Sequence, residues 1–346
     1  MISARCRRRL LATYLTDKNA WTILYVIWYF RLKFPDIIPY FDADLQHGVF
    51  MQRISLACVF LVVSGVVGMT TAEAFALPRV GVALPNPELS PLLTDDDGSG
   101  YDYNGIAKLN NCSGSLIRYE TSKNSDKAMI LTNGHCVSRP NGGFIQPNQY
   151  IANESSSRSF RFLKPNGDIG SGSVAATKIL YATMTGSDMA IYQLALSFEE
   201  IASTYHVDAL VLSSEHPILN DPIEILSGYW QTGYSCYIDQ FIFKMKEDAY
   251  SWNDSVRYSE DGCHTKHGTS GSPVISKTSG KVIAINNTGN DDGGRCTMNN
   301  PCEISETGDV SFKKGLSYAQ QTYPVYSCLN ADGVLNLAKP GCALFH

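Results

Sequence analysis

The sequence predicts an all-β protein built from two small antiparallel β-barrels in series. The chain is rich in turn-forming and β-forming residues, with 28 Gly and 19 Tyr among its 346 residues. Short runs of Val, Ile and Thr alternate with turn clusters, whereas helical signal is confined to residues 197–203. Many short strands at regular spacing are typical of an antiparallel barrel or sandwich, and the chain length suits two small barrels.

The composition excludes several classes of protein. Hydrophobic residues make up 44% of the chain and charged residues 18%, which is the reverse of a disordered sequence. The formal net charge of -5 excludes a chain-wide basic surface, so we expect no nucleic-acid partner. In the body of the chain no apolar run is long enough for a membrane helix, so we expect no stable membrane span in the mature protein.

Residues 51–76 have the layout of a secretory signal peptide. Arg53 supplies a positive start, residues 54–69 form an apolar centre, and Ala74-Phe75-Ala76 is a small-x-small cleavage site. Because a signal peptide normally begins a protein, residues 1–50 are interpreted as an upstream or mis-annotated segment. The pattern predicts a secreted or periplasmic protein; an uncleaved membrane anchor is the alternative.

The remaining chain divides into three parts. Residues 77–103, rich in Pro, Leu and Asp, are expected to form a mature N-terminal arm or a pro-segment. Residues 104–322 carry the motifs described below, and residues 323–346 form a tail that contains two cysteines. The acidic run Asp95–Asp97 lacks the alternating ligands and closing Glu of a calcium loop, so it is interpreted as a solvated turn.

The cysteines predict disulfides and not a metal site. Two of the ten, Cys6 and Cys58, precede the predicted cleavage site. An even number then remains, as expected for an exported chain, and no paired CxxC or HExxH spacing is present. The eight are Cys112, Cys136, Cys236, Cys263, Cys296, Cys302, Cys328 and Cys342. Proximity in the chain suggests the pairs Cys236–Cys263, Cys296–Cys302 and Cys328–Cys342.

Strand-like runs follow one another from residue 112 onward, separated by turn signals such as Asn-Gly and Asp-Gly. The expected strands are Ser115–Tyr119, Ala128–Thr132, Ser159–Leu163, Val174–Ala182, Ala190–Ala195, Ala209–Leu212, Tyr237–Lys244, Pro273–Ser276, Val282–Asn286 and Gly315–Ala319.

Three of the turns between these strands carry residues suited to chemistry. His135 follows the strand Ala128–Thr132 and precedes Cys136, while Asp188 stands at the entrance of an apolar strand. Ser270 lies in the Gly-flanked run Gly268-Thr269-Ser270-Gly271-Ser272-Pro273, immediately before another strand. Each of these features alone is most often structural, but together they supply a nucleophile, a base and a carboxylate.

Acyl transfer requires this set of groups. A serine hydroxyl is a weak nucleophile and needs an adjacent base, and imidazole titrates near neutrality. A buried carboxylate fixes the imidazole tautomer, and backbone N–H groups in a tight glycine turn can stabilise an oxyanion.

Four segments together resemble the chymotrypsin/trypsin-like family of secreted serine peptidases. They are residues 112–117 (CSGSLI), 132–136 (TNGHC), 187–190 (SDMA) and 268–273 (GTSGSP). The order His, Asp, Ser matches this family and not subtilisins or α/β-hydrolases. The resemblance covers residues 104–322. Thr269 stands where animal members have an Asp, so the chain is similar to bacterial-type members.

The resemblance implies two antiparallel six-stranded chymotrypsin-like barrels with the active site between them. It implies His135 as general base, Asp188 as its orienting partner and Ser270 as nucleophile, with the N–H groups of Gly268 and Ser270 as oxyanion hole. It further implies a Cys112–Cys136 disulfide. The expected protein is a monomeric serine endopeptidase that acts on protein or peptide substrates and needs neither cofactor nor metal.

Substrate recognition is expected near His264, Thr265 and Asn286. His264 lies six residues before Ser270, where trypsin-like members carry an Asp. With the cations Lys266 and His267 beside it, this segment suggests a preference for an acidic or small polar residue before the scissile bond. The run Val282–Asn287 resembles the edge strand that pairs with the substrate backbone.

Two other functions remain open from the sequence. A catalytically silent member of the same family could bind protein or carbohydrate through the same cleft. An esterase could use the same three side chains.

Overall fold

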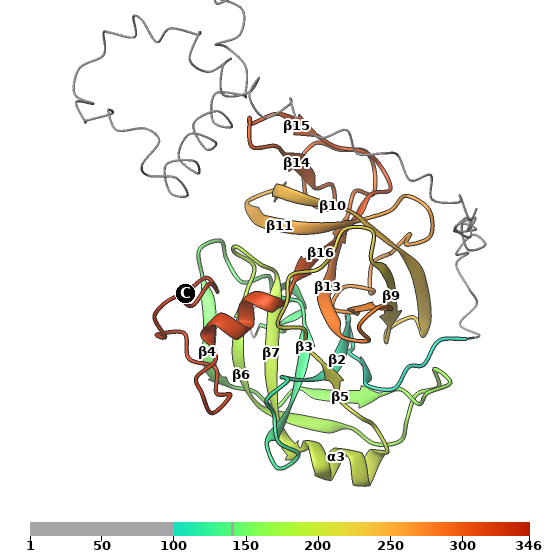
Figure 1. Cartoon of the computed structure of the whole chain (residues 1–346), viewed down its shortest axis with the longest axis vertical. Helices are drawn as coiled ribbons and strands as arrows, with labels where there is room; N and C mark the ends of the chain where they lie inside the picture. Colours follow the sequence, from blue (N-terminus) through green and yellow to red (C-terminus); the bar gives the residue numbers. More distant parts are fainter. Residues whose placement is uncertain (1–99, 140–141) are drawn as a thin grey trace, which may run out of the picture. The chain divides into compact units, whose positions relative to one another are not determined.

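The computed structural model describes residues 100–139 and 142–346 (Figure 1). The predicted upstream segment 1–50, the predicted signal peptide 51–76 and most of the predicted arm 77–103 lie outside these described residues. Among the residues described, no helix is both long enough and apolar enough to cross a membrane.

Six strands close the first barrel. The ring runs β1-β5-β6-β7-β3-β2, and the pairing of β1 with β2 closes it. All of its pairings are antiparallel. Outside the ring, β4 pairs with β6, and β8 adds in parallel to β2. The bounds are β1 Ile106–Lys108, β2 Ser113–Arg118, β3 Lys127–Thr132, β4 Tyr150–Ser155, β5 Ser159–Phe162, β6 Val174–Thr183, β7 Met189–Ser197 and β8 Leu210–Val211.

Six further strands close the second barrel. Its ring runs β11-β16-β13-β12-β9-β10 and closes through β10 and β11. Here too every pairing in the ring is antiparallel. Strands β14 and β15 extend the sheet from β10. The bounds are β9 Pro222–Ser227, β10 Thr232–Glu247, β11 Tyr250–Tyr258, β12 Pro273–Ser276, β13 Val282–Gly289, β14 Cys302–Ile304, β15 Val310–Ser311 and β16 Ser317–Gln321.

The predicted fold class, two antiparallel six-stranded barrels, is therefore confirmed. The two rings also share one order. When the six strands of each ring are counted in sequence order, the first strand pairs with the second and the fourth, and the third pairs with the sixth. No internal repeat is visible in the sequence, so the two barrels share topology without sharing a residue pattern.

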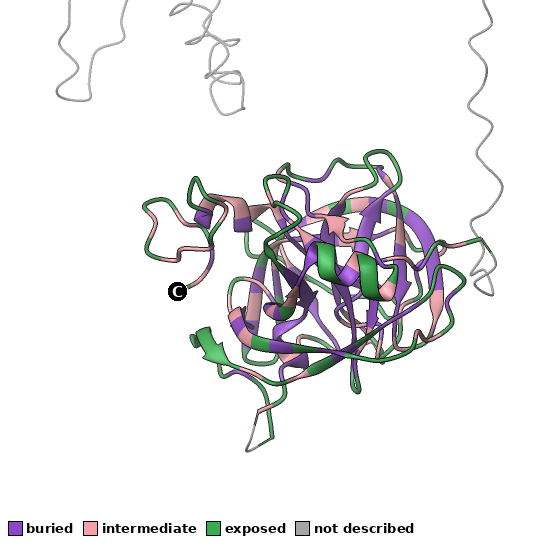
Figure 2. Ribbon diagram, turned by 90° about the horizontal axis from the view of Figure 1, so that it is seen from below, coloured by how far each residue is buried: buried purple, intermediate pink, exposed green. Residues whose placement is uncertain are grey.

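Buried apolar residues fill both barrels, and Figure 2 marks the buried parts of the chain. In the first, Leu116, Ile130 and Tyr192 are among the buried residues; in the second, Ile225 and Val256 are. Strand β7 is buried on both faces over its first four residues, Met189–Tyr192, where it leaves the segment that carries Asp188. The strand that follows Asp188 is thus anchored in the core from its first residue.

The expected helix is present as α3, Phe198–Tyr205, on the outside of the first barrel. It begins with a capping box, in which the Ser197 hydroxyl accepts the Glu200 N–H and the Glu200 carboxylate accepts the Ser197 N–H. Two buried side chains, Phe198 and Ile201, hold it against the barrel.

Several strands were not expected from the sequence, chief among them β9 and β11. Strand β11 contains Asn253-Asp254, a pair typical of turns, and Asp254 does adopt a left-handed φ of 53°. Pairing of Asn253 with Lys244 and of Ser255 with Ile242 nevertheless continues the strand on both sides of Asp254.

Four disulfides pair the cysteines as the sequence suggested: Cys112–Cys136, Cys236–Cys263, Cys296–Cys302 and Cys328–Cys342. The last one pins the C-terminal tail, which lies against the first barrel beside β4 and β6 (Figure 1). There the Tyr181 hydroxyl donates to the Phe345 carbonyl at 2.8 Å.

Removing the Cys112–Cys136 bridge is expected to lower the free energy of unfolding by about 2–4 kcal/mol, because the unfolded chain regains the freedom of a long loop. The Cys112→Ser/Cys136→Ser variant can be compared by urea denaturation with Cys296→Ser/Cys302→Ser. The first pair lies 24 residues apart and the second 6, so the second variant should lose less stability. An equal or larger loss in the second variant would contradict this account.

Candidate active site

His135 stands on a single 3₁₀ turn, η1 (Gly134–Cys136), directly after β3. The turn packs against β6 so closely that a Cβ on Gly134 would lie 1.9 Å from the Thr183 carbonyl oxygen and 3.1 Å from Asp188 Oδ1. Glycine at position 134 therefore allows the imidazole-bearing turn to approach the carboxylate.

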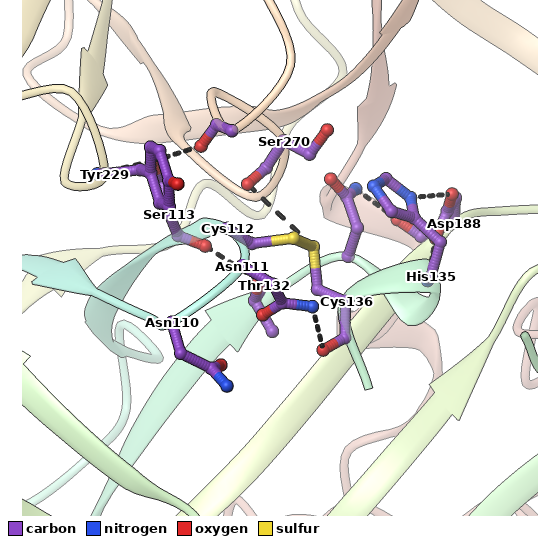
Figure 3. Close-up of a disulfide and its surroundings, with 12 residues drawn as sticks. Asn110, Asn111, Cys112, Ser113, Thr132, His135, Cys136, Asp188, Tyr229 and Ser270 are labelled. Carbon is purple, nitrogen blue, oxygen red and sulfur yellow. Dashed lines mark hydrogen bonds and ion pairs between the residues drawn. A yellow bond between two sulfur atoms is a disulfide. The ribbon is translucent and has the colours of Figure 1, made fainter. Parts of the chain in front are cut away.

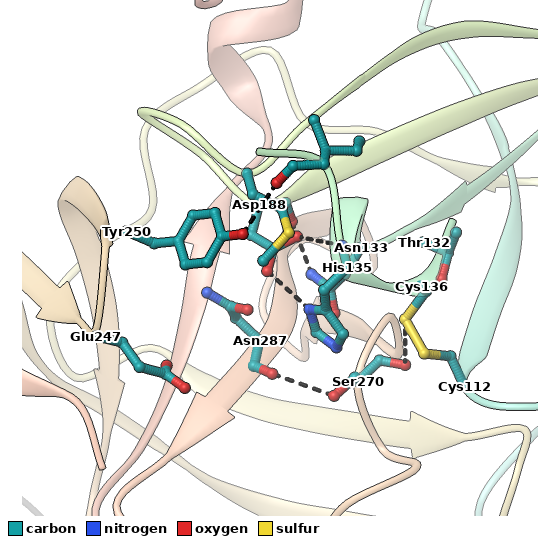
Figure 4. A network of polar contacts seen from close by, with 12 residues as sticks. Cys112, Thr132, Asn133, His135, Cys136, Asp188, Glu247, Tyr250, Ser270 and Asn287 are labelled. Carbon is teal, nitrogen blue, oxygen red and sulfur yellow. Dashed lines mark hydrogen bonds and ion pairs between the residues drawn. A yellow bond between two sulfur atoms is a disulfide. The ribbon is translucent and has the colours of Figure 1, made fainter. Parts of the chain in front are cut away.

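Asp188 holds His135 at two points (Figure 4). Its Oδ1 accepts the His135 backbone N–H at 3.0 Å, and its Oδ2 lies 2.7 Å from the ring Nδ1. The Asn133 side chain fixes the same segment by donating to the Asp188 carbonyl at 2.7 Å. An ionised carboxylate only accepts hydrogen bonds, so Nδ1 carries the proton and Nε2 is left with a free lone pair.

Nearby charges and burial have opposite effects on the pKa of His135. Burial by itself lowers the pKa of the imidazole, but the charge and hydrogen bond of Asp188, with the charge of Glu247, outweigh burial and raise the pKa above its ordinary value. Asp188 is 1% exposed, so its charge acts on the ring with little screening by solvent.

Ser270 lies in a loop of the second barrel that is fastened to the first barrel (Figure 3). The Ser113 N–H, at the start of β2, donates to the Ser270 carbonyl at 2.8 Å, and the Ser113 hydroxyl donates to the Gly268 carbonyl at 2.9 Å. From β13, the Asn286 carbonyl accepts the Gly271 N–H at 2.9 Å. These bonds fix the Ser270 loop beside the Cys112–Cys136 disulfide, which adjoins His135.

Glycine is required on both sides of Ser270. Gly268 and Gly271 have φ angles of 93° and 84°, which other residues rarely adopt. A Cβ on Gly271 would also lie 2.3 Å from the Ser113 carbonyl oxygen. Within the described chain, neither the Gly268 N–H nor the Ser270 N–H donates a hydrogen bond, so both remain available to a ligand.

His135, Asp188 and Ser270 line one cavity of about 160 Å³. In this conformation the Ser270 hydroxyl donates to the Asn287 carbonyl at 3.2 Å, and no hydrogen bond joins it to His135 among the residues described. Hydrogen bonds between a nucleophile and its base are often long or misaligned before a ligand binds. The two side chains are therefore assigned to one site because they line the same cavity.

The structure separates the predicted recognition residues. Thr265 lines the cavity, whereas His264 is exposed and is not part of the lining. His264 follows Cys263, which is buried and bonded to Cys236, so its side chain extends to the solvent side.

The expected edge strand requires a correction at Asn286. Strand β12 pairs with β13 over Val282–Ile285, and β16 pairs with it from Ala284 onward. Asn286 exchanges backbone hydrogen bonds with Gly271 and Ser272, so β13 has no free edge over residues 284–286. Asn286 lines the cavity, but its N–H donates to Ser272, and its side-chain oxygen accepts the Tyr258 hydroxyl. The free edge lies one step further, at Asn287–Gly289, beyond the end of β12.

The cationic rim expected from Lys266 and His267 is largely compensated. His267 Nε2 lies 2.7 Å from Asp291 Oδ2, and Lys266 lies over the Trp230 ring, 4.2 Å from its centroid. The structure therefore offers less free positive charge beside Thr265 than the sequence suggested.

Other cavity residues were missed from the sequence. Phe144, Met184, Glu247, Tyr250 and Trp252 line it together with His135. Glu247 ends β10, and Tyr250 and Trp252 belong to β11. No local motif marks these three residues, because they reach the site only when β10 and β11 pair.

The described residues contain one cluster of potential metal ligands, Cys112, His135 and Cys136. Both sulfur atoms belong to the Cys112–Cys136 disulfide, so neither is a thiolate that could bind a metal.

The comparisons with known proteins agree with this architecture. The model of the trypsin-like peptidase domain family matches residues 112–285, just over half of the chain. No curated protein matches the chain.

Several solved bacterial structures are similar. The MamO protease domain of Magnetospirillum magneticum is 12% identical, with 67% of this chain and 98% of that one covered at a TM-score of 0.41. The active form of the Rv3671c protease of M. tuberculosis is 15% identical, with 80% and 96% covered and a TM-score of 0.40. A Nocardiopsis protease is 16% identical, with 65% and 93% covered and a TM-score of 0.37.

The raised pKa of His135 can be measured by NMR titration of its ring. We expect a midpoint above 6.5, and a lower midpoint in Asp188→Asn, because that variant removes the charge while burial remains. The pair stabilises the fold fully below pH 6.5, and this contribution is lost as pH rises through the raised midpoint. Glu224→Gln, outside the cavity, is the matched control. An unchanged midpoint in Asp188→Asn would show that Asp188 does not raise the pKa.

Proposed function

The chain belongs to the trypsin-like peptidase domain family, and from this premise we propose that it is a secreted serine endopeptidase. It would hydrolyse peptide bonds through His135, Asp188 and Ser270 with a covalent acyl-enzyme. The family and the two-barrel fold support a peptidase; the mechanism is our proposal.

One observation carries the proposal. Asp188 accepts hydrogen bonds from both the backbone and the ring of His135, and that ring shares a cavity with the Ser270 hydroxyl. This arrangement leaves Nε2 as the atom that can accept a proton. A nucleophile, a base and a carboxylate that orients the base are the three groups that acyl transfer needs.

The proposed first step forms the acyl-enzyme. Ser270 Oγ attacks the carbonyl carbon of the scissile bond while its proton passes to His135 Nε2. The tetrahedral oxyanion accepts hydrogen bonds from the N–H groups of Gly268 and Ser270. When the C–N bond breaks, Nε2–H gives the proton to the leaving amine, and the acyl group stays on Oγ.

The second step releases the product. Water loses a proton to His135 Nε2 and attacks the acyl carbon, and the proton then returns to Ser270 Oγ as the acid leaves. Asp188 remains ionised and stabilises the imidazolium in both steps. The free edge Asn287–Gly289 is suited to hold an extended peptide by main-chain hydrogen bonds.

The export proposal combines two observations. Four disulfides fit an extracellular or periplasmic protein. Residues 51–76 have the pattern of a signal peptide, and N-terminal sequencing of the exported protein tests it: a first residue at Leu77 or beyond supports cleavage, whereas retained residues 51–76 would contradict it.

A catalytically silent binding protein is the second candidate. It is favoured by the hydrogen bond of the Ser270 hydroxyl to the Asn287 carbonyl, which in this conformation directs the hydroxyl away from the base.

Hydrolysis of a fluorogenic peptide library separates the two candidates. Ser270→Ala and His135→Ala should each lower kcat by about 10⁴–10⁶-fold, because the nucleophile, the base and the carboxylate act only together. The acid limb of kcat/KM should lie above pH 6.5, because His135 must lose its proton to act as base. Ser279→Ala, an exposed serine outside the cavity, should stay within about twofold. A folded wild-type protein that hydrolyses no peptide would favour the binding protein.

A further inference from the structure

Glu247 is a buried carboxylate at the candidate site with half of its hydrogen-bonding capacity unused. It is 5% exposed, and it lines the same cavity as His135 and Ser270. Its Oε1 accepts the Asn299 N–H at 2.7 Å. Its Oε2 accepts no hydrogen bond of normal length from the residues that the structure describes, although the Thr288 side chain is near enough to act on the carboxylate.

The charges around the cavity leave Glu247 without a cation. Asp188 pairs with His135, and Asp291 pairs with His267. Among the described residues, no ion pair involves Glu247. Burying a carboxylate is costly unless a charge or hydrogen bonds compensate it, so the protein alone leaves this group incompletely satisfied.

The cavity walls beside Glu247 are apolar and aromatic. Tyr250 and Trp252 lie nearly parallel, with ring centroids 6.5 Å apart. Their polar atoms are already bound, since the Tyr250 hydroxyl donates to Ile145 and the Trp252 indole N–H donates to Met184. Both rings line the cavity but are largely buried, with 7% of Tyr250 and 2% of Trp252 exposed, so they form an apolar wall beside Glu247. Aromatic surfaces that end in a carboxylate suit the methylene chain and charged group of Lys or Arg.

Glu247 and Ser270 lie on opposite sides of Asn287. Figure 4 shows Glu247 on one side of this residue, and Ser270 with the Cys112–Cys136 disulfide on the other. Thr288, on the free edge of β13, is close enough to lower the pKa of Glu247 in part, although burial raises it overall. A peptide laid along Asn287–Gly289 would therefore pass Glu247 further from the scissile bond.

We propose that Glu247 determines specificity by binding a cationic side chain, Lys or Arg, of the peptide substrate. The cation occupies a position upstream of the residue that precedes the scissile bond, where it pairs with the Glu247 carboxylate beside the apolar wall of Tyr250 and Trp252. This inference rests on the proposed peptidase function and adds a substrate class to it.

The test uses fluorogenic peptides that differ only at the second, third or fourth residue before the scissile bond, with Lys or uncharged norleucine at that position. In the full wild-type chain, kcat/KM should favour Lys about 10- to 100-fold at one position. In Glu247→Gln this preference should fall to about onefold, because cleavage of the Lys peptide slows more than cleavage of the norleucine peptide. Glu224→Gln, a half-buried glutamate outside the cavity, should keep the preference.

The comparison of matched peptides distinguishes recognition from other effects of Glu247. Loss of its charge also alters the pKa of His135, and a structural defect lowers activity, but both act equally on the Lys and norleucine peptides. An equal loss on both peptides, or no Lys preference in the wild-type chain at any position, overturns the inference.

Equilibrium binding separates this inference from the proposed function. The Kd of the same peptides is measured with Ser270→Ala and with Ser270→Ala/Glu247→Gln. Both variants lack the proposed nucleophile, so peptide binding is measured without cleavage. If Ser270→Ala binds the Lys peptide more tightly and the double variant does not, the cation site is supported. This holds even if the wild-type chain cleaves no peptide, an outcome that contradicts only the peptidase proposal. Equal affinities for the Lys and norleucine peptides in both variants overturn the cation site.

Discussion

The contact between Asp188 and His135 is the constraint on which the site depends. A buried carboxylate accepts both the backbone N–H and the ring Nδ1–H of one residue, so it fixes the position, the orientation and the tautomer of the imidazole together. This contact is possible only because Gly134 carries no side chain between the turn and β6. The same charge raises the pKa of His135 against the effect of burial, which links the geometry of the pair to its chemistry.

The second requirement is that Ser270, from the other barrel, be held at the same cavity. Ser113 makes this connection, since its N–H and its hydroxyl donate to the carbonyls of Ser270 and Gly268. Cys112, next in sequence, is bonded to Cys136, which follows His135. One short segment at the start of β2 therefore contacts the Ser270 loop and the His135 turn, so the two barrels are connected where the proposed chemistry occurs.

The sequence predicted those features that depend on neighbouring residues in the chain. The turns around His135, Asp188 and Ser270 have local signals, as do the strands that carry them and the short helix α3. Features that depend on pairing were missed or misplaced. Strand β11 contains a turn-like Asn253-Asp254, and Glu247 becomes part of the site only through the β10–β11 hairpin. Asn286 was expected on an open edge, but it pairs with β16 on one side and its backbone bonds the Ser270 loop on the other.

A crystal structure of the protein after reaction with a peptidyl phosphonate tests the central claim most directly, because the phosphonyl group imitates the tetrahedral intermediate. The account predicts a bond from phosphorus to Ser270 Oγ. It also predicts a phosphonyl oxygen that accepts from the N–H groups of Gly268 and Ser270, with His135 Nε2 facing the adduct and Nδ1 still bound to Asp188. A folded protein that forms no adduct, or an adduct on another residue, would contradict it.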